Sequence, residues 1–98
     1  MAQFDVHALP NGAWAVNVQS DLVSIFDTKL VIPLIHADAD ARPIARLNPS
    51  VAVLGEKRLL ATHLAGAVTK ARLGPLIANV SDQELTIKVA IDMLVSGF

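Results

Sequence analysis

The sequence predicts a mostly β domain that ends in one long α-helix. Short apolar segments separated by turn residues fill most of the chain, and an amphipathic segment follows at the C-terminus. The length of 98 residues suffices for one compact domain and not for two. Hydrophobic residues form 53% of the chain and charged residues only 17%, which excludes general disorder. We therefore expect a single domain over residues 1–98.

The first two strands are expected to form a hairpin. Apolar and polar side chains alternate in residues 4–8 and again in residues 14–19, as in half-buried strands. Asn11-Gly12 lies between them and favours a tight turn, because both residues tolerate positive φ. Trp14 is more typical of a core residue here than of a base-stacking surface.

Further strands are expected in the middle of the chain. Residues 30–35 are apolar throughout, as in a strand buried on both faces. Pro33 indicates an open edge or a bulge there, because proline cannot donate to a strand ladder. A long loop follows over residues 36–48, and a turn is expected at Gly55-Glu56. The later expected strands are residues 51–54 and 58–62, with a weaker candidate at 67–71.

The helix is the most closely specified element. Ser81 and Glu84 have the spacing of a capping box, in which the Ser81 hydroxyl accepts from the Glu84 amide. The helix is expected to run to about Val95, with Gly97 as its C-terminal stop. Val80 and Leu85 are expected to form a hydrophobic staple. Two apolar stripes follow at helical spacing, one comprising Ile87, Ala90, Ile91 and Leu94, the other Leu85, Val89 and Met93.

Charge and composition exclude several classes of function. Eight basic and nine acidic residues give a net charge of −1, which does not favour nucleic acid or an anionic membrane. Cysteine is absent, so disulfides and thiolate sites are excluded and a reducing cytoplasm is the expected location. We see no signal peptide and no apolar segment near the roughly 20 residues of a membrane span. A mean hydropathy of +0.50 favours a buried interface, most simply in a homodimer.

The sequence contains no catalytic motif and implies no cofactor. His36, Asp38 and Asp40 would share one face of an extended strand and could hold a cation, although a solvated loop is the commoner interpretation. Asp21 and Asp27 could do acid–base work, but Ser20 and Asp21 are more typical of a turn held by side-chain to backbone hydrogen bonds. The segment 22–26 is apolar where a loop is usually polar, and Phe98 follows the helix stop. Unless both dock onto the core, they indicate a module that binds protein rather than an enzyme.

The order and spacing of several segments resemble the CcdB family. Gln19-Ser20-Asp21 and Val31-Ile32-Pro33-Leu34 stand at the family's separation without a gap, although the residues between them differ. Residues 3–6 and 16–18 fit the family's first strands. The tail also matches in spacing, at Leu73-Gly74, Ser81, Glu84, Ile87-Lys88, Ala90-Ile91 and Gly97. The resemblance covers both ends of the chain well and residues 35–48 poorly.

The resemblance implies an SH3-like β-barrel of the CcdB/MazF type with a long C-terminal helix, working as a homodimer. Members of this family are toxins of plasmid-borne toxin–antitoxin pairs. They bind the A subunit of DNA gyrase and trap its cleaved complex without chemistry of their own, and a CcdA-like antitoxin neutralises them. Carried over by position, the gyrase-binding residues are Leu22, Val23, Asp92, Val95, Ser96, Gly97 and Phe98.

The chain departs from the family at the expected anchor. The family ends in Trp-Gly-Ile, whereas this chain ends in Ser96-Gly97-Phe98, and Asp92 replaces a neutral amide. Loss of a tryptophan hot spot can cost about 2–4 kcal/mol, or some 30- to 900-fold in affinity. Two alternatives therefore stay open: an inactive relative that only binds antitoxin, and an endoribonuclease of the MazF or Kid type, which shares the barrel.

Overall fold

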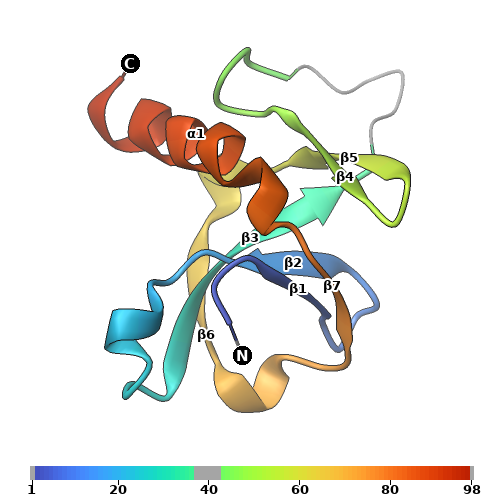
Figure 1. Ribbon diagram of the computed structural model, residues 1–98, viewed down its shortest axis with the longest axis vertical. Coiled ribbons are helices and arrows are strands. Elements are labelled where there is room, and N and C mark those ends of the chain that lie inside the picture. The colour runs from blue at the N-terminus through green and yellow to red at the C-terminus, as the bar shows by residue number, and fades with distance from the viewer. Residues whose placement is uncertain (1, 37–42, 98) are drawn as a thin grey trace.

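The structure is a computed structural model that describes residues 2–36 and 43–97. Strands dominate the described chain, short 3₁₀ helices connect them, and one α-helix ends it (Figure 1). The strands are β1 (Asp5–Ala8), β2 (Trp14–Asn17), β3 (Thr28–Ile35), β4 (Ser50–Val53), β5 (Glu56–Leu60), β6 (Gly66–Thr69) and β7 (Leu76–Asn79). The helices are η1 (Asp21–Val23), η2 (Thr62–Leu64), η3 (Lys70–Arg72), η4 (Ser81–Gln83) and α1 (Glu84–Ser96).

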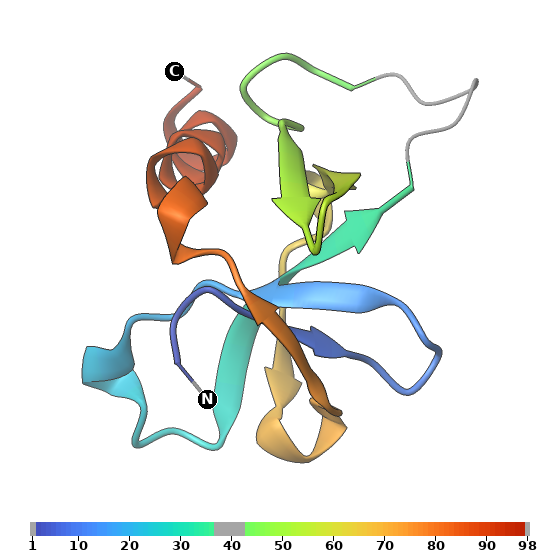
Figure 2. The same ribbon diagram turned by 45° about the vertical axis from the view of Figure 1, so that its right-hand side comes forward.

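One antiparallel sheet contains all these strands, in the order β4-β5-β3-β2-β1-β7, with β6 added to β3. The first half of β3 pairs with β6 and its last residues pair with β5, so the sheet divides and curls at β3. Helix α1 lies beside the β4–β5 hairpin above the curled part (Figures 1 and 2). The predicted fold class, a mostly β barrel with a C-terminal helix, is confirmed.

The main core lies between α1 and the concave side of the sheet. Ile87 and Ala90 of the helix are fully buried against strand residues such as Val16 and Ile32. They belong to the first predicted stripe, whose last member, Leu94, is 44% exposed. Within residues 2–36 and 43–97, no helix has the length and apolar character that crossing a bilayer requires.

The opposite face of β1, β2 and β3 is also buried, although it carries polar side chains. The expected half-buried alternation in residues 4–8 is therefore wrong. Asp5, His7, Asn17 and Lys29 all have 9% exposure or less. A small second cluster around Ala15, Val31 and Leu73 lies beside them. Phe4, expected in the first strand, precedes β1 with a φ of 69° and belongs to the main core.

Both hairpin turns differ in detail from expectation. Around Asn11-Gly12 only Gly12 has positive φ, and the Gly12 amide donates to the Leu9 carbonyl in a three-residue connection. The β4–β5 turn is Leu54-Gly55 rather than Gly55-Glu56, because Val53 pairs directly with Glu56. Both turn residues have positive φ, as a two-residue turn of this hand requires.

The later elements are shifted or were missed. The strand expected at 58–62 is β5, which ends at Leu60, and the candidate at 67–71 is β6 followed by η3. β7 was not expected, because Leu76–Asn79 is too short to show a pattern. Pro33 lies between the β6 and β5 ladders on one edge of β3, where its carbonyl accepts from the Ala61 amide. The expected open edge or bulge is thus replaced by an interruption between two ladders, because β3 lies inside the sheet.

The start of the helix also differs. The capping box is wrong, because the Ser81 amide donates to Asn79 Oδ1 and α1 begins only at Glu84 with no side-chain cap. The staple is wrong too, since Leu85 is 77% exposed. Instead, Gln83 holds the helix start to the hairpin. Its Oε1 accepts from the Ala52 amide at 2.9 Å and its Nε2 donates to the Ala52 carbonyl at 2.8 Å.

The predicted C-terminal stop is confirmed. Gly97 has a left-handed φ of 80°, and its amide donates to the Met93 carbonyl at 3.0 Å. A residue with a side chain would be strained in this conformation, which is why glycine suits the end of the helix. The bond between Gly97 and Met93 closes the last turn of α1, whose exposed residues belong to the expected binding site.

Candidate functional site

The loop of residues 21–27 carries the most exposed apolar side chains of the expected site. Leu22 is 93% exposed, Ile25 87% and Phe26 57%, while Val23 is 40% exposed. These exposed fractions show that the segment does not dock onto the core of this chain, so that alternative is wrong. Large apolar side chains that are exposed to water are typical of a surface that a partner covers.

The last turn of α1 carries the second part of the expected site. Val95 is 76% exposed, and Asp92, Ser96 and Gly97 are exposed as well. Phe98 lies outside the described residues. The described side chains of both parts thus face solvent, as residues that bind a partner must.

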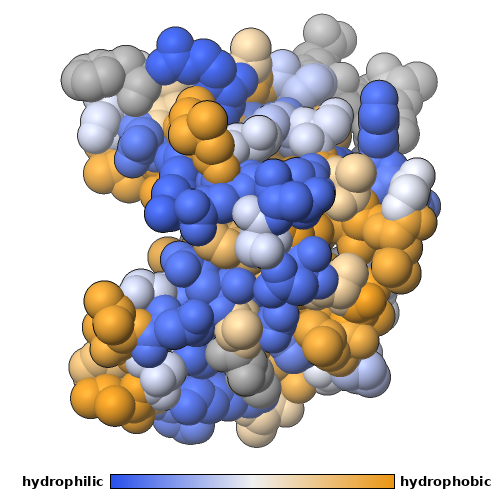
Figure 3. Space-filling view, viewed as in Figure 1, coloured by the Kyte–Doolittle hydropathy of each residue, from blue (hydrophilic) through white to orange (hydrophobic). Residues whose placement is uncertain are grey.

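The two parts lie on the same side of the molecule and are separated by a hollow. In Figure 1, η1 and the C-terminal end of α1 occupy the lower and upper parts of one side. The space-filling view shows a notch between them, with hydrophobic atoms gathered over the lower part (Figure 3). A partner that contacts both parts must therefore span this notch.

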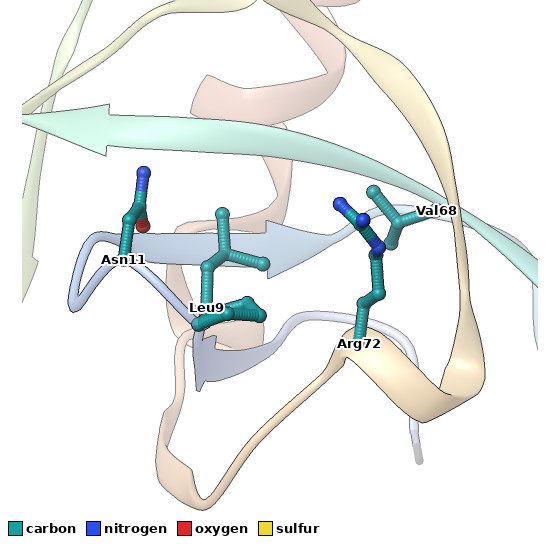
Figure 4. A pocket seen from close by; sticks show the side chains of 5 residues that line it. Leu9, Asn11, Val68 and Arg72 are labelled. Carbon is teal, nitrogen blue, oxygen red and sulfur yellow. The ribbon is translucent and has the colours of Figure 1, made fainter.

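A small pocket lies between the β1–β2 connection and the segment formed by β6 and η3. Leu9, Pro10 and Val68 give it apolar walls, and the side chains of Asn11 and Arg72 flank it (Figure 4). Its volume of about 180 Å³ is below the roughly 300–1,000 Å³ typical of small-molecule sites. The pocket suits one side chain of a partner better than a metabolite.

A second hollow lies between α1 and the segment that precedes β4. Leu85 and Val89 of the second predicted stripe line it, together with Arg46, Pro49 and Thr86. Its volume is about 380 Å³. The second stripe is therefore only partly covered within the described chain: Leu85 is exposed, whereas Val89 and Met93 are half-buried.

One cluster of ionisable side chains was missed by sequence reasoning. The Arg58 guanidinium stacks over the Trp14 ring, 3.6 Å from its centroid, and lies 3.1 Å from Glu56 Oε2. Glu56 Oε1 in turn lies 4.0 Å from His36 Nδ1. Glu56 and Arg58 are two residues apart on β5, but only the folded sheet brings Trp14 and His36 beside them, so no local motif could have shown the whole cluster. Trp14 packs against the core, as expected, but its ring also carries the arginine.

A second polar cluster is buried on the other face of the sheet. His7 Nδ1 donates to the Gly74 carbonyl at 2.9 Å, and its Nε2 is buried without a hydrogen-bond partner, 3.9 Å from Asp5 Oδ2. Burial alone would raise the pKa of Asp5. Hydrogen bonds from Asn79 Nδ2 and the Ala2 amide, together with the nearby His7, lower it by more, so the pKa of Asp5 lies below its ordinary value. This cluster ties β1 to β7 and to the N-terminus.

The structure gives no support to a metal centre in its described part. Residues 2–36 and 43–97 contain no group of three or more potential ligands close enough to hold an ion. Of the expected cation cluster only His36 is described, and Asp38 and Asp40 lie outside the described residues. Ser20 has the expected turn role, because its hydroxyl accepts from the Leu22 amide, whereas Asp21 Oδ1 accepts from the distant Gln3 amide at 2.9 Å.

The sequence matches the CcdB protein family over residues 3–97. The chain belongs to the CcdB family. The resemblance to this family is therefore confirmed. No protein with a curated function matches the sequence.

Solved structures with the same fold share little sequence with this CcdB-family chain. One is an endoribonuclease from a mycobacterial species in complex with its cognate antitoxin, with 11% identity and a TM-score of 0.81 over 97% of this chain and 94% of that one. Another is an endoribonuclease from a mycobacterial species, with 13% identity and a TM-score of 0.79 over 97% and 90% of the two chains. At these identities the likeness establishes the fold alone.

Proposed function

We propose that this CcdB-family chain is the toxin of a toxin–antitoxin pair and acts by binding the A subunit of DNA gyrase. The observation that carries the proposal is the exposure of Leu22 and Val95, at 93% and 76%. These side chains stand at the positions that the family resemblance assigns to gyrase contact. Large apolar side chains held in water are typical of a surface that a partner covers.

The residues around Ser96 set the expected strength of this contact. Serine offers little area and no π face where the family has tryptophan, and Asp92 adds a negative charge to the same exposed turn. We therefore infer that gyrase binding is weaker than in relatives with the tryptophan, by about 30- to 900-fold.

Calorimetry with a fragment of the host's gyrase A subunit tests the proposal. The natural chain is measured beside Ser96→Trp, with Leu85→Trp as a control that adds the same side chain at the other end of α1. Binding by the natural chain supports a working gyrase ligand. Binding gained only by Ser96→Trp supports a scaffold that has lost its anchor, and no binding by any variant overturns the proposal.

We further propose that the chain works as a homodimer that an antitoxin neutralises. Exposed apolar side chains also lie outside the proposed gyrase contact, such as Leu64 and Leu76 at 56% and 60%, and a second copy of the chain could cover them. A structural neighbour from a mycobacterial species is held by its cognate antitoxin. Light scattering at micromolar concentration tests the dimer, which a stable monomer would exclude, and co-purification with the protein encoded beside it tests the antitoxin.

An endoribonuclease is the second candidate, and the cluster of His36, Glu56 and Arg58 favours it. Cleavage of RNA by its 2′-hydroxyl needs a base for that hydroxyl and an acid for the leaving oxygen, roles open to a carboxylate and an imidazole. The arginine is already paired with Glu56 and only 10% exposed, which weighs against a phosphate contact. Cleavage of mixed RNA that Glu56→Gln abolishes would favour this candidate over the first.

A further inference from the structure

The loop of residues 21–27 has no apolar anchor in the described structure. All residues from 20 to 28 are exposed, and η1 buries no side chain. Most loops with a defined shape place at least one side chain in the core, which offsets the entropy lost on ordering. The conformation of this loop must therefore come from hydrogen bonds.

Hydrogen bonds near its first residues hold the base of the loop. Gln19 Nε2 donates to the Val23 carbonyl at 3.1 Å, and Gln19 Oε1 accepts from the Leu30 amide at 3.0 Å. The Ser20 hydroxyl accepts from the Leu22 amide at 3.2 Å. These contacts join the two ends of the loop but do not reach residues 24–27.

Lys70 holds the remaining part. Its Nζ donates to the Ser24 carbonyl at 3.0 Å, and its backbone amide donates to the Asp27 carbonyl at 2.9 Å. Lys70 is half-buried and directly follows β6, which is paired with β3 through Thr69 and Thr28. The backbone of Lys70, the first residue of η3, is therefore joined directly to the paired end of β6, while its ammonium group reaches the loop.

We propose that Lys70 is a positioning residue that fixes the orientation in which the loop presents Leu22 and Ile25 to a binding partner. The Ser24 carbonyl lies between these two side chains in sequence, so one hydrogen bond constrains both. A charged donor makes this bond stronger than a neutral one. A loop ordered before binding loses less freedom on binding, which raises affinity. The role in affinity depends on the proposed function, whereas the ordering of the loop does not.

The test compares three variants of the full chain. Lys70→Met keeps the length of the side chain and loses the donor, and Lys70→Arg keeps a charged donor. Lys57→Met is the matched control, because it removes the same charge from an exposed lysine of β5. Two quantities are measured: hydrogen exchange of the Ser24 and Phe26 amides, and affinity for the gyrase A fragment, in the Ser96→Trp background where that is needed for binding.

Lys70→Met is expected to speed the exchange of both amides and to weaken binding about tenfold, with little change in thermal midpoint. Lys70→Arg should keep both the exchange rates and the affinity close to those of the natural chain. Lys57→Met should change neither quantity. Unchanged loop exchange in Lys70→Met overturns the proposal, as does faster exchange with unchanged affinity. Faster exchange in a protein that binds no gyrase, even with Ser96→Trp, supports the ordering role and removes gyrase as the target.

Discussion

Replacing Gly74 by alanine tests a close approach between two backbone segments. A Cβ at this position would lie 2.8 Å from the Ala8 carbonyl oxygen, and that oxygen is backbone that cannot move aside alone. The same carbonyl accepts from the Gly74 amide at 2.8 Å, while the Gly74 carbonyl accepts from His7 Nδ1 at 2.9 Å. Relieving the overlap must strain or break both bonds. At about 1 kcal/mol for each bond and 1–3 kcal/mol for overpacking, we expect a loss of about 3–5 kcal/mol.

Equilibrium unfolding in urea measures this loss, and Gly66→Ala is the matched control. The nearest atom to a Cβ at Gly66 is the Leu64 carbonyl oxygen at 3.9 Å, an ordinary contact. This variant should change the free energy of unfolding by less than about 1 kcal/mol, because alanine also restricts the unfolded chain. Equal stability of the two variants would refute the reasoning that close approach requires glycine at position 74.

Three further predictions follow from the buried groups. Asp5→Asn should destabilise the fold at pH 7, and the difference in unfolding free energy from the natural chain should shrink as pH falls below about 4. The reason is that a carboxyl group with a lowered folded-state pKa stabilises the fold only while it is charged. Unfolding curves at pH 7 and pH 3 check this, and a constant difference would contradict it. Ile87→Ala should cost about 2–5 kcal/mol in the same urea assay, since the side chain is fully buried between helix and sheet, and a cost below 1 kcal/mol would mean that this contact is loose. Arg58→Met should cost about 1–2 kcal/mol and shift the fluorescence of Trp14, whereas an unchanged emission spectrum would speak against the stacked arginine.

Local signals explain which elements could be predicted. Three features depend on the backbone of a single residue. Gly12 in the first hairpin and Gly97 at the end of the helix adopt positive φ, and Pro33 cannot donate a backbone hydrogen bond where the ladder is interrupted. The predicted capping box does not form because the Ser81 amide, which Glu84 would accept from, donates to the side chain of Asn79 two residues earlier. Capping residues and turn residues are the same residue types, so the sequence alone does not separate the two uses.

Contacts between distant residues were beyond reach of the sequence. Lys70 and Ser24 are 46 positions apart, and only the pairing of β6 with β3 brings them together. Arg58 looked like one of several scattered arginines, although register places it on Trp14. The exposed apolar site could be anticipated from composition, because apolar residues in a loop between two aspartates are unusual. That this loop and the C-terminal end of α1 lie on the same side of the molecule could be seen only in the structure.

The Gln83 side chain has a consequence for how this protein can assemble. β4 stands at one end of the strand order, where an unpaired edge invites a strand from another molecule. Both the amide and the carbonyl of Ala52 on that edge are already occupied by the Gln83 amide. A foreign strand therefore cannot extend the sheet at Ala52 without first displacing the start of α1.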